Sequence, residues 1–223
     1  KKLNNKEINI INVDYNFKGV FEKISKKSNK YIKKSFKIAL EILKKNNFSK
    51  FINGPISKRY FLEGKSLGIT EYLAKKSKIK NEVAMLIFNG KLSVSPITTH
   101  LALKDVSKNI SKEKIHSHVK LISQFYKKRF KKNARIAITG LNPHCESNFK
   151  DCEESAIIEP AIRYLKKKKY KVEGPFPADT IFIQKNFKKF NVIIGMYHDQ
   201  VLTPMKSLFG FDAINITLGL PFV

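Results

Sequence analysis

The sequence has 223 residues and is 42% hydrophobic, which is enough to bury a core in one large domain or two modest ones. Its 44 basic and 18 acidic residues give a net charge of +26, yet only four are arginine, the side chain best suited to phosphate and guanine, so we expect a solvated basic surface and no nucleic-acid partner. No apolar run is long enough for a membrane span, and no signal peptide is recognisable, so we expect a cytoplasmic protein with no membrane partner.

The first 80 residues are predicted to form a partial α/β domain. Glu7 to Val13 is predicted to be a strand, and Tyr31 to Lys45 a helix with one apolar face. Gly54-Pro55 indicates a turn, and Thr70-Glu71 is expected to begin a short helix. We place the domain boundary near Ile79 to Glu82, which divides the chain into domains 1–80 and 81–223.

The second predicted domain alternates strands and helices, the pattern of a layered α/β protein with a mainly parallel sheet. Asn89-Gly90 signals a hairpin, so one antiparallel pair is expected. Ser111 is predicted to cap a helix that ends near Phe130, and Pro160 to disturb a helix over Glu153 to Lys167. The predicted strands are Val83 to Phe88, Leu92 to Ile97, Arg135 to Thr139, Val192 to Met196 and Ile214 to Leu218.

Three of the five histidines, His100, His144 and His198, each follow the carboxyl end of a predicted strand. Ligands bind at that edge of an open α/β sheet, because the loops there point side chains into one crevice. Three converging imidazoles would form an open metal site with coordination positions left for a substrate. The alternative is that each is a hydrogen-bonded structural residue. His116 and His118 lie among lysines in the long helix and are expected on its solvated face.

Other polar residues crowd near the same strand ends, where each alone also fits a cap or a turn: Asn142, Asp179, Thr180, Asp199, Gln200, Lys206 and Asn215. Gly64-Lys65-Ser66 imitates the end of a phosphate-binding loop, but Arg59 stands where that loop needs glycine. The sequence has no GxGxxG and no GxSxG motif. The residues alone therefore predict no dinucleotide cofactor. Cys145 and Cys152 are expected to be free thiols.

Seven stretches from Asn53 onward resemble, in order and spacing, the 4-hydroxythreonine-4-phosphate dehydrogenases of pyridoxal phosphate biosynthesis. They are NGPISK, GITEYLA, TTHLALKDV, ARIAITGLNPH, GPFPADTIF, MYHDQVLTPMK and NITLGLPF. The resemblance implies two α/β domains around a central cleft, with mixed, mainly parallel sheets as in isocitrate and isopropylmalate dehydrogenases. It also implies an obligate homodimer with active sites at the subunit interface, and use of NAD without a Rossmann motif.

The resemblance assigns roles only to residues at positions that match the family's motifs. The family's metal ligands match His100, His144 and His198, the last completing the neighbouring subunit's site in the family. Its substrate-binding positions match Thr70, Lys206 and Asn215, and acidic positions of its pocket match Asp179 and Asp199. Asp199 or Lys206 is the expected proton-transfer group, and no NAD-contacting residue is assigned. The metal is expected to be zinc, with magnesium, manganese, cobalt or nickel as alternatives.

The resemblance implies NAD-dependent oxidation and decarboxylation of 4-phosphohydroxy-L-threonine to 3-amino-2-oxopropyl phosphate. The alternatives are a dehydrogenase of another phosphorylated hydroxy acid, such as threonate or erythronate phosphate, and a non-catalytic metal-binding homologue. Ile69 stands where the family usually has a histidine, and isoleucine cannot donate a hydrogen bond to a substrate phosphate, so the exact substrate stays open. Compared with the family, we expect the chain to be truncated at both ends, with incomplete cofactor binding.

Overall fold

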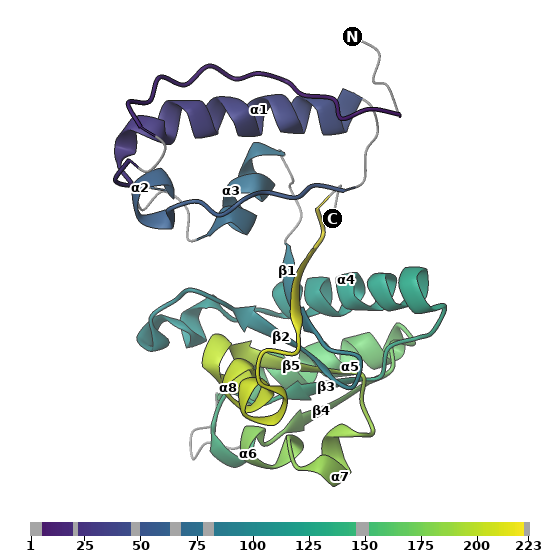
Figure 1. Ribbon diagram of the computed structural model, residues 1–223. Helices are drawn as coiled ribbons and strands as arrows, with labels where there is room; N and C mark the ends of the chain where they lie inside the picture. The colour runs from purple at the N-terminus through teal and green to yellow at the C-terminus, as the bar shows by residue number, and fades with distance from the viewer. Residues whose placement is uncertain are drawn as a thin grey trace. The chain divides into compact units, whose positions relative to one another are not determined.

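The computed structural model describes residues 6–19, 22–45, 50–62, 68–77, 83–145 and 152–220 (Figure 1). Contacts divide these residues into two compact units, one reaching Ser77 and the other running from residue 83 to residue 220. The expected domains 1–80 and 81–223, each of α/β type, stay a prediction. Among the described helices, none combines the length and the apolar composition needed to cross a membrane.

The first unit is built on packed aromatic rings. Its helices are α1 (Asn29–Lys45), α2 (Lys58–Leu62) and α3 (Ile69–Lys76), with a 3₁₀ turn η1 (Lys26–Ser28) before α1. Phe36 of α1 is buried, and its ring centroid lies 5.7 Å from that of Phe61 and 5.5 Å from that of Tyr72. Such ring pairs bury large apolar areas, so they stabilise helices that are short individually. The predicted helix from Tyr31 to Lys45 is confirmed within α1.

The predicted strand from Glu7 to Val13 is wrong. These residues form neither helix nor strand, and Ile8 and Ile10 are 90% and 85% exposed. A strand needs a neighbour to pair its N–H and C=O groups. Within the described part of this unit there is no strand to supply that pairing, so alternating isoleucines alone did not produce one.

A six-stranded sheet forms the centre of the second unit, in the order β4-β3-β5-β2-β1-β6. The strands are β1 (Ala84–Phe88), β2 (Ser93–Thr98), β3 (Ile136–Thr139), β4 (Val172–Phe176), β5 (Val192–Tyr197) and β6 (Ile214–Leu218). Strands β4, β3, β5 and β2 pair in parallel, whereas β1 pairs antiparallel with β2 and with β6. The mixed, mainly parallel sheet and the hairpin at Asn89-Gly90 are confirmed.

Strand β4 is the one that the sequence reading missed. Its sequence VEGPF contains Gly174-Pro175, a pair that usually signals a turn. Proline is tolerated in a strand only where its missing N–H is not needed, typically on an edge strand. Because β4 is an edge of this sheet, the pair fits there.

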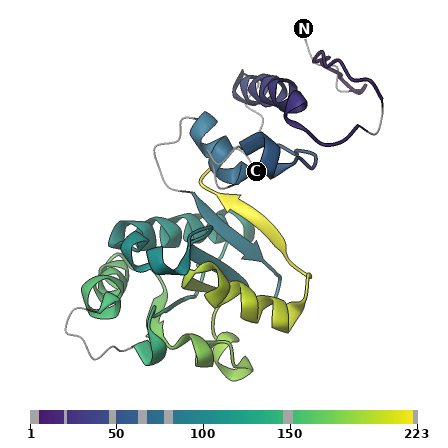
Figure 2. The ribbon, with the colours of Figure 1, turned by 90° about the vertical axis from the view of Figure 1, so that its left-hand side faces the viewer.

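Helices cover both faces of the sheet (Figures 1 and 2). Helices α4 (Lys112–Phe130) and α5 (Glu159–Lys167) pack on one face, and α6 (Ala178–Ile181), α7 (Gln184–Phe187) and α8 (His198–Phe209) on the other. Ile194 of β5 contributes to the first core and its neighbour Ile193 to the second, and both are fully buried. Double coverage explains why β5 is an uninterrupted apolar run. Shorter turns are η2 (Leu103–Asp105), η3 (Ser107–Asn109), η4 (Pro143–Cys145) and η5 (Glu154–Ile158).

Two predicted helix features agree with the structure. The Ser111 side chain accepts a hydrogen bond from the Lys114 backbone N–H at 3.3 Å, as an N-cap does. The helix predicted over Glu153 to Lys167 is interrupted, because η5 is a π-helical turn and α5 begins only at Glu159. Pro160 is the second residue of α5, directly after the π turn, and it has no N–H to donate to that turn.

The expectation that His116 and His118 lie on a solvated helix face is wrong. His118 is only 4% exposed, and its Nδ1 lies 3.3 Å from the Ser95 hydroxyl of β2. His116 is partly buried, with its ring 4.4 Å from that of Tyr164 on α5. The lysines nearby suggested solvent, but α4 packs on the sheet and beside α5. Burial lowers the pKa of His118 to about 4, and the charge of Lys114 adds to that effect.

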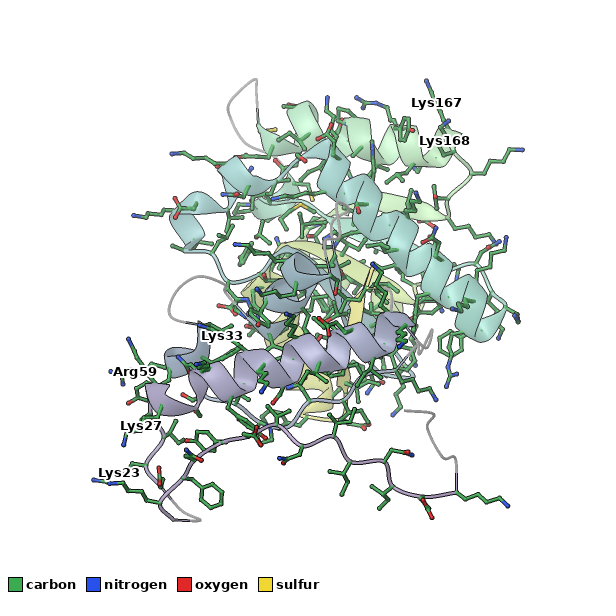
Figure 3. All side chains as sticks on the ribbon, turned by 90° about the horizontal axis from the view of Figure 1, so that it is seen from above. Lys23, Lys27, Lys33, Arg59, Lys167 and Lys168 are labelled. Atoms are coloured by element: carbon green, nitrogen blue, oxygen red, sulfur yellow. The ribbon has the colours of Figure 1, made fainter. Side chains whose placement is uncertain are left out.

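The basic side chains come from many elements. In Figure 3, Lys23, Lys27, Lys33 and Arg59 of the first unit extend away from its ribbon, and the pair Lys167-Lys168 does so at the end of α5. Side chains of this kind remain hydrated, and their summed charge acts on other ions over a distance of about 8–10 Å at ordinary salt. The expectation of a solvated basic surface agrees with this distribution.

One buried amide ties two strands of the sheet together. Gln200, 8% exposed, accepts hydrogen bonds through Oε1 from the Thr139 hydroxyl at 2.9 Å and the Met196 N–H at 2.7 Å. Its Nε2 donates to the Gly140 carbonyl at 2.8 Å. A Cβ added to Gly195 would lie 2.4 Å from Val201 Cγ1, so α8 packs directly on β5. Gln200 therefore fixes the ends of β3 and β5 relative to α8.

We expect the buried His118 to make folding pH-dependent. In the unfolded chain, His118 binds a proton with a pKa near 6.5, whereas in the folded chain its pKa is about 4. The free energy of unfolding should therefore fall, by at most about 3 kcal/mol from this group, as the pH drops through that interval. Urea unfolding at several pH values checks this. A His118→Asn variant, which cannot titrate, should show a shallower slope, and an unchanged slope contradicts the assignment.

We expect Gln200→Ala to lower the free energy of unfolding by about 2–4 kcal/mol, because it leaves a buried hydroxyl, an amide N–H and a carbonyl without their partner. The exposed Gln124 of α4 provides the matched control. Gln124→Ala should change the free energy of unfolding by less than about 0.5 kcal/mol. Equal urea midpoints for the two variants would contradict the bracing role.

Candidate functional site

The predicted site residues gather mainly along one edge of the sheet. The parallel strands β2 and β5 end in register, with Thr98 opposite Tyr197, and β3 and β4 end with Thr139 opposite Phe176. The segments that follow these strand ends carry all three of the predicted metal ligands and Asp179. This is the carboxyl edge, where open α/β sheets bind their ligands.

His100 and His198 lie side by side at that edge. Their ring centroids are 6.2 Å apart, with the ring planes inclined by 38°. Each follows one of two neighbouring strands, and the Thr98 hydroxyl donates a 2.7 Å hydrogen bond to the Met196 carbonyl that ties those strands together. His100 lies two residues beyond the end of β2, and His198 directly follows β5. The parallel register of these two strands therefore places the two histidines side by side.

Asp199 orients the ring of His198. The Asp199 Oδ1 accepts a hydrogen bond from His198 Nδ1 at 2.7 Å. Because a carboxylate accepts only, the proton lies on Nδ1, and Nε2 presents its lone pair. A carboxylate on one ring nitrogen of a histidine is the usual partner when the other nitrogen binds a metal. The His198 side chain is 35% exposed and that of Asp199 is 79% exposed, so the pair is open to solvent.

His144 is held in an unusual backbone conformation after β3. It lies in η4 with φ 57° and ψ 10°, and Cys145 beside it has φ 60°. No group of three histidine, cysteine, aspartate or glutamate side chains among the described residues of one chain is placed to hold a metal ion. The structure therefore brings His100 and His198 together but does not add His144 to them within one chain. The three-histidine site stays a prediction.

Glu154 is a site residue that sequence reasoning missed. Its Oε1 accepts hydrogen bonds from the backbone N–H groups of Leu141 and Asn142 at 2.7 and 2.8 Å, and its Oε2 from Asn142 Nδ2 at 2.9 Å. These bonds support the loop that carries His144. The sequence offered only a glutamate at the start of a predicted helix, which is ordinary, so no local signal distinguished it.

A hollow of about 620 Å³ opens beside this edge, between α6 and α8. Both predicted acidic residues, Asp179 at the start of α6 and Asp199 at the start of α8, line it. Its remaining lining residues are Ala178, Phe182, Ile183, Tyr197, Gln200, Thr203, Pro204, Ser207 and Leu208. The structure thus brings the two carboxylates to one solvent-accessible space next to His198. A second hollow, of about 510 Å³ in the first unit, is lined by none of the predicted site residues.

Two predicted substrate-binding residues of the second unit lie apart from the histidine pair, and the third belongs to the first unit. Lys206 is eight residues along α8 from His198, which is about 12 Å of helix rise. Asn215 of β6 pairs with Ile87 of β1, several residues from the carboxyl edge. Thr70 belongs to α3 in the first unit. The described residues of the second unit therefore do not join Lys206 and Asn215 to the histidine pair.

The sequence pattern of the family described as "Pyridoxal phosphate biosynthetic protein PdxA" matches residues 1–223. A 4-hydroxythreonine-4-phosphate dehydrogenase of Sulfurihydrogenibium sp. (strain YO3AOP1) is 41% identical over 220 residues, covering 97% of this chain and 66% of the relative. A D-threonate 4-phosphate dehydrogenase of Pectobacterium atrosepticum is 35% identical over 158 residues, 70% of this chain and 48% of the relative.

The fold is also that of solved relatives. The crystal structure of a 4-hydroxythreonine-4-phosphate dehydrogenase from Klebsiella pneumoniae superposes with a TM-score of 0.76 at 31% identity, covering 90% of this chain and 62% of that one. The chain spans roughly half to two thirds of the length of the curated relatives it matches. A match over the whole chain, with the α/β sheet in common, shows that the chain belongs to the PdxA family of pyridoxal phosphate biosynthetic proteins.

Proposed function

We propose that the protein is an NAD-dependent and metal-dependent dehydrogenase that oxidises and decarboxylates 4-phosphohydroxy-L-threonine, giving 3-amino-2-oxopropyl phosphate for pyridoxal phosphate biosynthesis. Family membership supports the reaction class, since the relatives described above are named as dehydrogenases of phosphorylated hydroxy acids. The structural observation that carries the proposal is the pair His100 and His198 at the carboxyl edge, with a carboxylate on Nδ1 of His198.

The histidine pair suits a divalent cation. The centroids of the two rings lie 6.2 Å apart, close enough for both imidazoles to contact one divalent cation. His100 and His198 would hold the ion, with His144 as the third imidazole, and zinc is the cation that we propose. When bound, the ion supplies Lewis acidity, which lowers the pKa of a coordinated substrate hydroxyl.

Residues of the chain would orient the metal ligand, accept a proton and bind the substrate. Asp199 keeps the proton of His198 on Nδ1, so Nε2 stays available as a ligand. Asp179 and Asp199 share the hollow beside the pair, where either carboxylate can accept the proton that leaves the hydroxyl. Lys206, whose Nζ now lies 5.7 Å from the Phe211 ring centroid, carries a flexible cation for the phosphate or carboxylate of the substrate. We propose Thr70 and Asn215 as further substrate contacts.

The proposed reaction is an oxidation followed by loss of carbon dioxide. At C3 of the substrate, the hydroxyl would lose its proton to a base and the carbon would lose its hydrogen as a hydride, which NAD would accept, leaving a β-keto acid. That acid loses its carboxylate as carbon dioxide, and a proton restores the ketone. The nicotinamide cofactor is inferred from the dehydrogenase relatives, and we assign no described residue to it.

We also propose that the protein works as a homodimer. The described residues of one chain do not assemble three ligands, and the resemblance places the family's active sites at a subunit interface. An ion held by imidazoles from two copies of the chain would join the two subunits at the site. The net charge of +26 favours the approach of anionic, phosphorylated substrates to such a site.

A second substrate has specific support. Ile69 replaces the histidine that the family usually has next to the substrate-binding threonine, and a relative 35% identical to the chain is named D-threonate 4-phosphate dehydrogenase. Loss of one hydrogen bond to a phosphate weakens binding by about 1.5–3 kcal/mol, and because both acids carry a phosphate, the named relative is what favours the second substrate. Direct comparison of the two substrates decides between them.

We expect NADH to form when the purified full-length protein is given NAD, zinc and 4-phosphohydroxy-L-threonine. A chelator should abolish the rise in NADH absorbance, and added zinc should restore it. D-threonate 4-phosphate is the comparison substrate, and the larger kcat/KM identifies the substrate class. Turnover that survives complete metal removal contradicts the metal-dependent mechanism. Zinc binding without turnover of either substrate would support the non-catalytic alternative.

We expect Asp199→Asn to weaken zinc binding by about 10–100-fold, because asparagine cannot hold the His198 tautomer as a carboxylate does. Competition with a coloured chelator measures the affinity. Asp179→Asn removes the same charge from the same hollow without touching a histidine, so its zinc affinity should stay within about fivefold of the original protein. Equal losses in both variants would show that only net charge matters.

A further inference from the structure

A glutamate is buried next to the loop that follows β3. Glu154 is 1% exposed, and no ion pair joins it to a lysine or arginine within the described part of the chain. Burial by itself raises the pKa of this carboxyl, but hydrogen bonds from the backbone and side chain of Asn142 and the backbone of Leu141 outweigh it and lower the pKa. The hydrogen bonds of the loop therefore stabilise a buried negative charge that has no counter-ion among the described residues.

The contacts of Glu154 concentrate on two successive residues of that loop. One oxygen receives both backbone N–H groups, of Leu141 and Asn142, and the other receives the Asn142 side chain. Hydrogen bonds to an ionised acceptor are about twice as strong as neutral ones. Three of them on one carboxylate fix the direction in which the chain leaves β3, two residues before His144.

The space around Gly140 is shaped by this contact. A Cβ on Gly140 would lie 2.9 Å from Glu154 Oε1 and 2.8 Å from the Cys145 sulfur, so a larger residue would push the carboxylate away. On its other side, Gln200 donates to the Gly140 carbonyl. Two side chains thus hold the start of the loop. The Glu154 carboxylate accepts from the backbone N–H groups that follow Gly140, and the Gln200 amide donates to the Gly140 carbonyl.

The end of the same loop is strained. His144 and Cys145 are consecutive non-glycine residues in the left-handed region, with φ of 57° and 60°. Each such residue costs about 1 kcal/mol or more and persists only when its surroundings hold it there. Glu154 itself begins the π-helical turn η5, an irregularity frequent near functional sites. The strained position is therefore that of a predicted metal ligand, two residues after Asn142, which Glu154 binds from the π turn.

We propose that Glu154 is a positioning residue, which clamps the loop Gly140–His144 so that His144 is presented to the divalent cation. The inference rests on the metal site of the proposed function and adds a residue that acts on the ligand through the backbone. A purely structural brace would also lose stability on substitution. It would not, however, alter zinc affinity in protein that remains folded, so affinity separates the two roles.

The test compares Glu154→Gln with Glu153→Gln. Glu153 also accepts a hydrogen bond from Asn142 Nδ2, at 2.9 Å, but it is only partly buried and is the neighbouring residue in sequence, which makes it a matched control. Glutamine at 154 keeps the shape but removes the charge and sets its NH₂ group against that of Asn142. We expect zinc affinity to fall by about 10–100-fold in Glu154→Gln and by less than about fivefold in Glu153→Gln.

Hydrogen exchange gives a readout that needs no metal. The amides of Leu141 and Asn142 should exchange at least about tenfold faster in Glu154→Gln than in Glu153→Gln, since a tenfold change corresponds to the loss of one ordinary hydrogen bond. If Glu154→Gln does not fold, Glu154→Asp replaces it. Aspartate keeps the charge but is one methylene too short to reach both amides, and it should show losses in the same direction.

Each outcome bears on a definite claim. Faster exchange with weaker zinc binding supports the clamp. A folded Glu154 variant that binds zinc as tightly as the original protein overturns it, even if its unfolding midpoint is lower. Failure of the unsubstituted protein to bind zinc overturns the metal site of the proposed function, and this inference with it. That failure appears before any variant is made, so the two are distinguishable.

Discussion

The parallel alignment of β2, β5 and β3 is the constraint on which the candidate site depends. Parallel strands run in one direction, so every segment that leaves them begins at the same edge, however far apart the residues are in sequence. This brings His100 beside His198 across a separation of 98 residues. Side chains strengthen the alignment where it matters, since Thr98 bonds to the end of β5 and Gln200 joins the ends of β3 and β5. The site is therefore a property of the sheet more than of any single loop.

The sequence predicted this edge well because its signals are local. Apolar runs followed within a few residues by histidine identify strand ends, and the hairpin and the Ser111 cap are short-range patterns. The failures all depend on tertiary context. Glu7 to Val13 alternates like a strand but has no described partner, and β4 contains a glycine-proline pair that only an edge strand accepts. The burial of His118 and the contacts of Glu154 follow from how helices pack, which no local pattern records.

Charges of opposite sign act on the candidate site at different ranges. The lysines extend from many surface elements, and at long range they give the molecule a positive field. Close to the histidine pair, the charged groups that line the hollow are Asp179 and Asp199, and Glu154 is ionised beneath the neighbouring loop. Short-range carboxylates favour a cation at the imidazoles, whereas the long-range field favours an anionic substrate. A cation bound by neutral rings and an anionic substrate are thus compatible with the same surface.

Helix α8 carries three of the predicted site residues on one element, His198 and Asp199 at its first two positions and Lys206 eight residues after His198. Helix geometry, rather than loop conformation, therefore sets the axial offset between His198 and Lys206 at about 12 Å. The close approach of Val201 to Gly195 prevents the helix from sliding along the sheet. The helix therefore limits the length of a molecule that can extend from the imidazole of His198 to the ammonium group of Lys206. Only the flexible lysine side chain can adapt to a different length.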